Sequence, residues 1–319
     1  MKLTEAMKFL SPAIEKTNKI LPVLSHIRIT QGYAVASNGM LAMAAPIALP
    51  LDCTPNGLLL EKAVERFGDD FSATQQANGS LYFKANGFQV TVPCTTDYFP
   101  MPDFSGEPVL PGTGLLAALK RLLPFTTKTE DQPWRDGILL RGGKALATCG
   151  HTLAWVPVAL PEGVEVVIPS DAARAMLEIG LGPEYLARSQ DRLVVVYSEG
   201  RFLSYPLIHT PWPATANLVE HQPTQPIPEG FWKAIRDIQP FALPGTNADT
   251  FYLLDGAVAS DKAGIGAKAD VPGVLGGWSC NYSAIRLIEK HAKKINFTSR
   301  FGSWEGDGIC GKIALTKVS

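Results

Sequence analysis

The stretch GLLAALKRLLPFTTK (residues 114–128), with GILLRGG (137–143) and ALATCGHTLAWVPVAL (145–160) after it, carries the pattern that decides the fold. Its leucines, among them Leu115 and Leu119, recur at the spacing of one helical face, which predicts an amphipathic helix. The two later segments are apolar and β-branched runs separated by glycine turns, which is typical of strands. The local unit is therefore one helix followed by strands.

This unit recurs about six times, at a spacing of roughly 50 residues, which is typical of an array of one supersecondary repeat. The predicted helices cover residues 3–19, 58–68, 114–128, 169–180, 228–241 and 281–294. The predicted strands cover 26–30, 33–37, 41–49, 80–85, 88–93, 137–143, 145–160, 192–198, 201–208, 250–256, 257–271, 295–300 and 311–318.

Two proline-dense segments without periodicity, 94–112 and 209–230, divide the six repeats into pairs. We therefore predict an α+β protein of three similar domains, each made of two repeats. The predicted domains cover residues 1–105, 106–222 and 223–319.

Composition places the chain among soluble globular proteins. It is 46% hydrophobic and 18% charged, and no apolar run approaches the roughly 20 residues that a membrane span needs. The start of the sequence carries charges among its apolar positions, unlike a signal peptide. The five cysteines are scattered and show no CxxC spacing. This pattern favours reduced thiols, a cytoplasmic location, and no disulfide framework, metal site or cofactor.

Positive charge is concentrated on the predicted helices. The chain has a net charge of −1, which counts against simple wrapping of nucleic acid by bulk charge. The six helices nevertheless carry 15 basic and 9 acidic residues. On any single helix such residues are explained by solvation alone. A bias shared by six helices indicates instead a basic side of the molecule, which is enough for a weak, sequence-independent hold on phosphates.

The pair Cys149 and His151 raises the question of a nucleophile and its base. Such a pair needs an activated thiolate and a third, orienting group, and the sequence supplies no recognisable one. Residues at i and i+2 around Gly150 are more typical of a strand reversal. A cytosolic hydrolase that uses this pair is kept as a rival hypothesis. The segment GIGAK (264–268) lacks the strand, helix and GK[ST] context of a phosphate-binding loop.

Four segments in order resemble the bacterial sliding clamp, the β subunit of DNA polymerase III. KILPVLSHIRI (19–29) is similar to the family's TLPILSN segment, and TTDYFPMPDF (95–104) to its DFP linker. ATCGHTLA (147–154) is similar to ATDGHRLA, and TPWPATANLV (210–219) stands where the family has a GFPDY type of segment.

The resemblance implies a non-enzymatic processivity factor. Family members have three domains of two β-α-β-β-β units each, and two chains close head to tail into a ring around duplex DNA. Helices line the hole and a continuous sheet forms the outside. A pocket between domains 2 and 3 binds short linear peptides of the polymerase and the clamp loader. The rival is a multidomain β-rich structural or binding protein that forms no ring.

The resemblance also implies site residues. The partner-peptide pocket is expected at Thr148, Gly150, His151, Leu153, Ile313, Leu315 and Val318. The acidic residue and the arginine of the family's turn are Cys149 and Thr152 here, and the C-terminal residues also differ. Such drift would fit a phage- or plasmid-encoded member, and we expect an altered peptide preference.

Two further sets follow from the helices and from the resemblance. DNA-facing positions are expected at Lys19, Lys120, Arg121, Lys128, Trp134, Lys233, Arg236, Arg286, Lys290, Lys293 and Lys294. For Trp134, a loop-packing role is an equal alternative. The homodimer interface is expected at Phe88, Val90, Phe241 and Leu243.

Overall fold

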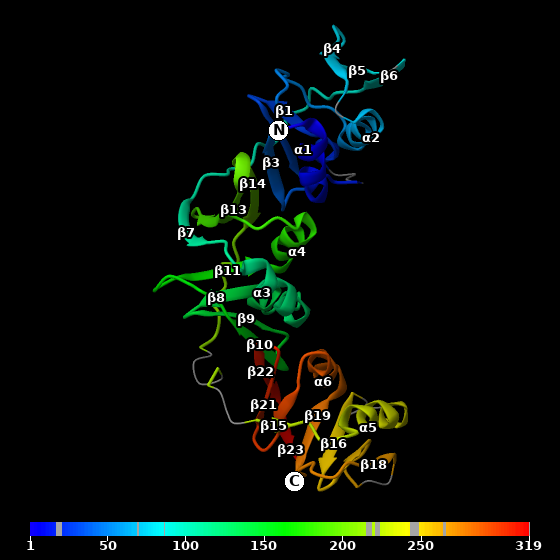
Figure 1. Ribbon diagram of the computed structural model, residues 1–319, viewed down its shortest axis with the longest axis vertical. Helices are drawn as coiled ribbons and strands as arrows, with labels where there is room; N and C mark the ends of the chain where they lie inside the picture. Colours follow the sequence, from blue (N-terminus) through cyan, green and yellow to red (C-terminus); the bar gives the residue numbers. More distant parts are fainter. Residues whose placement is uncertain are drawn as a thin grey trace. The chain divides into compact units, whose positions relative to one another are not determined.

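A computed structural model describes the chain in two compact units (Figure 1). The described residues are 1–16, 21–68, 70–85, 87–214, 219–220, 224–242, 249–263 and 266–318. The first compact unit holds residues 1–116 and 171–207, and the second holds residues 117–170 and 208–319. Lys19 and Leu243 lie outside the described residues. Among the described residues, no helix is both long and apolar enough to cross a bilayer.

All six predicted helices are confirmed, each beginning within three residues of its expected start. They are α1 (Leu3–Leu10), α2 (Gly57–Phe67), α3 (Leu115–Leu122), α4 (Ser170–Ile179), α5 (Phe231–Ile238) and α6 (Tyr282–Glu289). Local sequence explains two of the starts. The side chain of Asn56 accepts a hydrogen bond from the Leu59 amide, and Asn281 accepts from Ser283 and Ala284. These contacts satisfy amides that a helix start leaves without partners.

The helices end earlier than predicted, and proline is the reason for three of them. Helices α1, α3 and α5 each run into a 3-10 turn whose second residue is proline: Ser11–Ala13, Leu123–Phe125 and Gln239–Phe241. Proline cannot continue an α-helix because it lacks the amide donor and clashes with the preceding turn. The same ending therefore marks the first helix of each predicted domain.

The first compact unit contains two antiparallel sheets. Its seven-stranded sheet has the order β1-β2-β3-β14-β13-β12-β7, and its three-stranded sheet has the order β4-β5-β6. The strands are β1 (Arg28–Thr30), β2 (Tyr33–Ser37), β3 (Ala42–Pro46), β4 (Ser72–Gln75), β5 (Leu81–Ala85), β6 (Phe88–Val92), β7 (Glu107–Pro111), β12 (Tyr185–Arg188), β13 (Arg192–Tyr197) and β14 (Arg201–Pro206).

The second compact unit contains an eight-stranded sheet, β11-β8-β9-β10-β22-β21-β20-β15, and a five-stranded sheet, β18-β17-β16-β19-β23. The strands of the first are β8 (Gly137–Arg141), β9 (Lys144–Thr148), β10 (Thr152–Pro157), β11 (Glu165–Pro169), β15 (Gln225–Pro226), β20 (Lys294–Asn296), β21 (Phe301–Gly306) and β22 (Ile309–Ala314). Those of the second are β16 (Thr250–Leu254), β17 (Ala257–Ala259), β18 (Lys268–Asp270), β19 (Trp278–Asn281) and β23 (Thr316–Lys317).

The third strand after a helix joins one repeat to another. In the first compact unit β3 pairs with β14, with Met43 opposite Leu203. In the second, β10 pairs with β22, with Leu153 opposite Lys312. Two other third strands, β6 and β18, lie at the ends of their sheets. One pairing rule therefore builds both large sheets and leaves two equivalent strands without a neighbour on their outer edges among the described residues.

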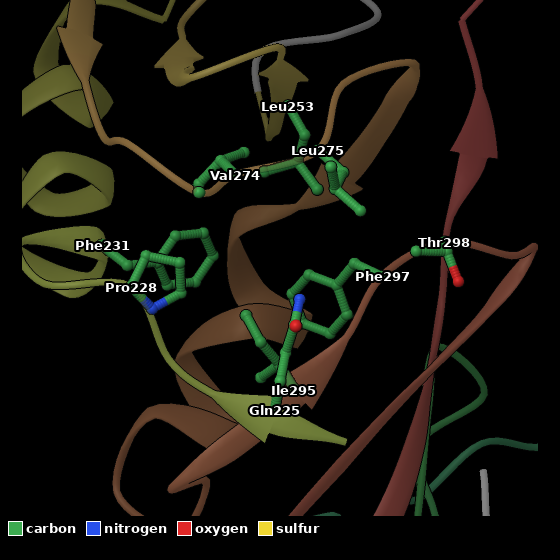
Figure 2. A pocket seen from close by; sticks show the side chains of 10 residues that line it. Gln225, Pro228, Phe231, Leu253, Val274, Leu275, Ile295, Phe297 and Thr298 are labelled. Carbon is green, nitrogen blue, oxygen red and sulfur yellow. The ribbon is translucent and has the colours of Figure 1, made fainter. Parts of the chain in front are cut away.

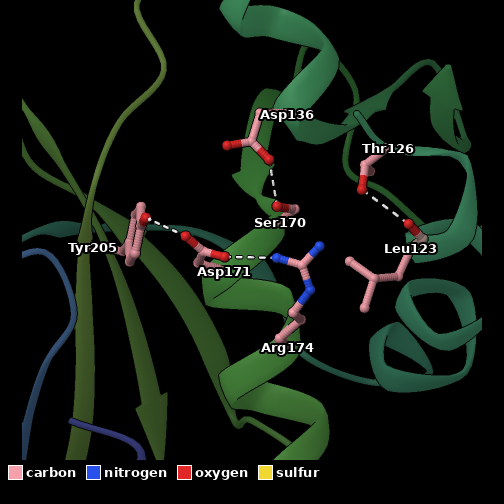
Figure 3. A network of polar contacts seen from close by, with 7 residues as sticks. All are labelled: Leu123, Thr126, Asp136, Ser170, Asp171, Arg174 and Tyr205. Atoms are coloured by element: carbon pink, nitrogen blue, oxygen red, sulfur yellow. Dashed lines mark hydrogen bonds and ion pairs between the residues drawn. The ribbon is translucent and has the colours of Figure 1, made fainter. Parts of the chain in front are cut away.

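The start of α4 shows how polar contacts fix a helix (Figure 3). In the second compact unit, the buried Ser170 hydroxyl donates to the Asp136 carboxylate. In the first, Asp171 accepts from Arg174 at 2.6 Å and from the Tyr205 hydroxyl at 3.1 Å. An acidic residue in the first turn is also favoured by the helix dipole. Arg174, the one basic residue of α4, is thus held by a carboxylate of its own helix.

Candidate nucleic-acid and partner sites

Helices α3 and α6 are amphipathic as predicted. In α3 the side chains of Leu115, Leu119 and Leu122 are buried, whereas Lys120 and Arg121 are exposed. In α6 the residues Ile285 and Ile288 are buried and Arg286 is exposed. Apolar faces pack inward and leave the basic positions on the surface of the second compact unit, as a helix over a sheet requires.

Several of the predicted DNA-facing cations already have partners. Lys233 pairs with Asp237 at 2.5 Å within α5, and Arg236 pairs with Glu289 of α6. Arg286 donates to the side chain of Gln239. Exposed pairs of this kind contribute little to stability but neutralise charge locally.

Lys120 and Lys290 differ from this group. Both are exposed, and neither forms an ion pair with an acidic residue among those that the structure describes. Among the described basic residues of α3 and of the C-terminal end of α6, these two lysines have the charge that is most available to a phosphate. Lys128 is also exposed, beyond the end of α3.

The predicted helix over residues 281–294 is too long at its C-terminal end. Helix α6 stops at Glu289, and the amides of both His291 and Ala292 bond back to the Ile288 carbonyl. Lys294 is therefore the first residue of β20, where it pairs with Glu305 at 2.9 Å. Pairing of β20 with β21 takes precedence over helical periodicity here.

Asp307 accepts hydrogen bonds from two of the predicted DNA-facing cations. It lies in the tight turn between β21 and β22 with a φ of 44°, followed by Gly308 with a φ of 75°. The Asp307 carboxylate accepts from Lys293 Nζ at 2.5 Å, and its backbone carbonyl accepts from Arg121 at 2.6 Å. The hydrogen bond from Lys293 lowers the pKa of the Asp307 carboxyl, so this group is ionised at neutral pH. It therefore offsets positive charge that the helices would otherwise present.

Aromatic packing holds this region together. Phe125, just after α3, stacks on Trp304 of β21 at 5.7 Å between ring centroids and lies 5.6 Å from the His291 ring. Burial, then the nearby Arg121 and Lys290 cations, lower the pKa of His291. The imidazole is consequently neutral at pH 7 and adds no charge to the surface.

Trp134 packs against other aromatic side chains, which agrees with the loop-packing alternative. Its ring lies edge-on to Trp212 at 5.3 Å, against a cluster that includes Leu146 and Trp155. In the pairing of β10 with β22, Trp155 lies opposite Cys310. The next residue of β22, Gly311, lies against Trp304, on which Phe125 stacks. Since side chains alternate across a strand, Trp134 and Phe125 cover opposite faces of the sheet.

The turn between β9 and β10 is built by its own backbone. The Gly150 amide donates to Thr148 Oγ1 at 3.0 Å, and the Cys149 amide donates to the Thr152 carbonyl at 3.2 Å. The Cys149 thiol points to the same Thr152 carbonyl, at 3.9 Å. Gly150 has a φ of 96°, which favours glycine. The geometry is that of a strand reversal, not of a nucleophile with its base.

Arg135 is a residue of this turn that the sequence did not reveal. A Cβ atom placed on Gly150 would lie 2.5 Å from the Arg135 guanidinium carbon, so the guanidinium rests directly on this glycine. The same group lies over the Trp134 ring at 5.4 Å. Thr152, which stands where the clamp family has an arginine, is buried. A cation at the turn therefore comes from a different segment, which no local spacing could indicate.

A pocket of about 440 Å³ opens beside this turn in the second compact unit. His151 and Val318 line it, together with residues of β16, β19 and β23, and the Ala314 amide donates to the His151 carbonyl at 2.8 Å. Leu153, Ile313 and Leu315 are buried in or next to the paired strands β10 and β22. Thr148 is also buried, and Gly150 is adjacent to His151. Of the seven expected residues, two thus line the pocket, and the other five lie in the neighbouring turn or in the adjoining strands.

A second pocket, on the apolar side of α5, is a packing gap (Figure 2). Phe231, Val274, Leu275 and Phe297 point into it, and its free space of about 30 Å³ equals the share of one water molecule. It is far smaller than the pocket beside His151.

Three of the four expected dimer-interface residues are described, and they lie at exposed or half-buried positions. Phe88, on the edge strand β6, is 48% exposed and contacts the rings of Phe67 and the guanidinium of Arg66. Val90 is half-buried on the same strand, and Phe241, after α5, is 61% exposed. Within the described residues, no group of three metal-ligating side chains is close enough to hold a metal ion.

Comparison with solved structures identifies the fold. No family model matches the sequence, and no curated protein matches it either. The chain superposes on the DNA polymerase sliding clamp of Bacillus subtilis with a TM-score of 0.76 at 15% identity, covering 99% of this chain and 97% of that one. The DNA polymerase III subunit beta of Pseudomonas aeruginosa gives 0.77 at 14% identity, covering 99% and 98%.

The β chain of DNA polymerase III from Streptococcus pneumoniae gives a TM-score of 0.75 at 15% identity, covering 99% of this chain and 97% of that one. Matches over nearly the full length of both chains confirm the fold that the four sequence segments had indicated. The chain therefore has the fold of the bacterial DNA polymerase III β subunit, the sliding clamp.

Proposed function

We propose that this protein is a DNA sliding clamp, a non-enzymatic processivity factor that encircles duplex DNA as a homodimeric ring and tethers a polymerase. The observation that carries the proposal is the strand-pairing rule. The third strands β3 and β14 pair, as do β10 and β22, and the equivalent strands β6 and β18 have no neighbour on their outer edges in the part of the chain that the structure describes. An open edge is a ready template for another strand. Pairing of β6 in one copy with β18 in a second would apply the same rule between chains, and a two-fold axis would close the ring.

The proposal includes a division of the chain into three domains, each made of two repeats. The repeated 3-10 endings at Pro12, Pro124 and Pro240 support that division, because they occur once in each predicted domain. The basic positions of α3, α5 and α6 would then contact the duplex loosely. Ring closure makes tight contacts unnecessary, and weak phosphate contacts permit sliding.

Partner proteins would dock in the pocket beside His151. Its position next to the C-terminal strand β23, its volume and its mixed polar and apolar lining support this assignment. Short linear segments of a polymerase or of a clamp loader are the proposed occupants.

Replacing Asp307 with asparagine should strengthen DNA binding, because it releases Lys293 for phosphate. One additional phosphate contact is expected to steepen the slope of log affinity against log salt by about 0.9. The measurement is binding of the full chain to a duplex across a salt series. Lys290→Glu with Lys120→Glu should act in the opposite direction. If neither variant changes the slope, these residues do not face DNA.

The rival function, a β-rich binding protein without a ring, predicts a monomer at all concentrations. Sedimentation of the full chain separates the two, since the proposed clamp must populate a dimer.

A further inference from the structure

Two of the five cysteines lie next to each other in the first compact unit, whereas the other three belong to the second. Cys53 follows β3 and is 5% exposed, and Cys94 follows β6 and is half-buried. Burial, and then the charge and hydrogen bond of the adjacent Cys94 thiol, raise the pKa of Cys53 to about 12. Burial also raises the pKa of Cys94, although the hydrogen bond with Cys53 lowers it in part. The two thiols are therefore free, protonated at neutral pH and in direct contact.

Backbone pairing brings the two thiols together. The segment 53–56 lies between β1 and the residues that follow β6. On one side, Cys53 exchanges two backbone hydrogen bonds with Ile29, of 3.1 and 2.8 Å. On the other side, the segment pairs antiparallel with Pro55 opposite Cys94. Since side chains alternate along an extended segment, Cys53 and Cys94 are diagonal neighbours on the same face.

A pocket of about 570 Å³ gives small molecules access to the pair. Cys53, Cys94 and Arg28 all line it, and its volume is within the range of about 300–1,000 Å³ that is typical of small-molecule sites. The Arg28 guanidinium, which is ion-paired with Asp52, counteracts part of the rise in the pKa of Cys53. A cation therefore stands where it can stabilise a Cys53 thiolate when one forms.

We propose that Cys53 and Cys94 are a reversible oxidation site, at which a small-molecule disulfide converts the two thiols into one intrachain disulfide. The Cys94 thiolate, from the less buried residue, attacks one sulfur of the small disulfide, and one small thiol leaves. The Cys53 thiolate then attacks the Cys94 sulfur of the mixed disulfide, and the second small thiol leaves. Two protein thiols are oxidised, one small disulfide is reduced, and the two protons pass to the two small thiols that are released.

The position of the pair sets the properties of this disulfide. Diagonal neighbours on a β-ladder are about 7–8 Å apart, slightly farther than most disulfides allow between Cα atoms. Closing the bond strains the two segments, and strained disulfides are readily reduced. The segment between the cysteines contains α2 and the strands β4, β5 and β6. The bond would thus restrain the repeat that carries the edge strand β6, because a closed loop gains less entropy on unfolding.

The test incubates the full chain with oxidised glutathione for several hours at mildly alkaline pH, since both thiols are protonated at neutral pH. Acid quenching, alkylation of free thiols and peptide mass spectrometry should then find Cys53 linked to Cys94 in most molecules. Dithiothreitol should restore both thiols. In the oxidised protein, hydrogen exchange of the α2 amides that open with this repeat should slow by about tenfold or more.

Serine variants make the result specific. Cys53→Ser removes the thiol that attacks the mixed disulfide, so glutathione should accumulate on Cys94. Cys149→Ser and Cys310→Ser are matched controls, because both thiols are half-buried and lie in the second compact unit. Both variants should form the link between Cys53 and Cys94 to the same extent as the unchanged protein.

Three results would overturn the proposal. They are the absence of a link between Cys53 and Cys94, glutathione that persists on Cys94 in the unchanged protein, and a link that leaves hydrogen exchange of α2 unaltered. The inference goes beyond the proposed clamp function and does not depend on it. Failure of that function would appear in DNA retention and not in the mass or the hydrogen exchange of the oxidised chain.

Discussion

Replacing Trp304 with alanine should lower the free energy of unfolding by about 3–5 kcal/mol, the usual cost of removing a large aromatic side chain from a core. Trp304 is 1% exposed, stacks on Phe125, and lies flat on Gly311, where an added Cβ would come within 2.2 Å of the indole. The indole therefore fills the space between β21, β22 and the end of α3. Urea denaturation followed by circular dichroism measures the loss.

Phe301→Ala is the matched control. Phe301 is on the same strand and also aromatic, but it is 39% exposed and begins the strand. Its replacement should cost about 1 kcal/mol or less, because little buried area is lost. Equal losses in the two variants would show that the contact between Phe125 and Trp304 does not support the second compact unit.

Replacing Lys268 with proline should weaken self-association by about 100-fold or more, because it removes an outward backbone donor and leaves a partner carbonyl unsatisfied. The direction of this donor follows from the ladder. Ser260 donates to the Ala267 carbonyl and Val271 to the Gly256 carbonyl. Hydrogen-bonded pairs alternate, so the amide of Ala269 bonds to β17 while the amides of Lys268 and Asp270 point to the open edge of β18.

Proline is tolerated on an edge strand when its missing amide would face solvent, so the monomer should stay folded. Lys268→Thr is the control, since it removes the same side chain and keeps the amide. Sedimentation equilibrium gives the dissociation constant of each variant. Identical constants would exclude β18 as the strand that joins two copies.

The helices of this fold can be predicted from the sequence because residues within or next to each helix determine where it forms. Asparagine caps begin α2 and α6, leucine spacing defines α3, and proline ends three first helices. Several strands were not predicted, namely β4, β7, β11, β12, β15, β19 and β21. Strand β7, with the sequence EPVLP, lies in a proline-dense segment without alternation, and only its pairing with β12 makes it a strand.

The candidate sites also combine features that local sequence predicts with features that depend on distant contacts. The turn at Gly150 and the exposed Lys120 follow from local patterns, whereas Asp307 and Arg135 act on residues far away in the sequence. Arg121 reaches Asp307 across 186 positions, and no spacing rule can reveal such a contact. The placement of Lys294 on a strand likewise results from pairing with β21, which overrides the helical pattern.

Retention on DNA with blocked ends tests the central claim most directly. A linear duplex is fixed to a bead at one end, the protein is allowed to thread over the free end, and that end is then capped with a bulky protein. A ring should survive washing in high salt, which removes electrostatic binders, and should leave once a restriction enzyme cuts the duplex. Loss of the protein in the high-salt wash, or equal retention before and after cutting, would contradict the account.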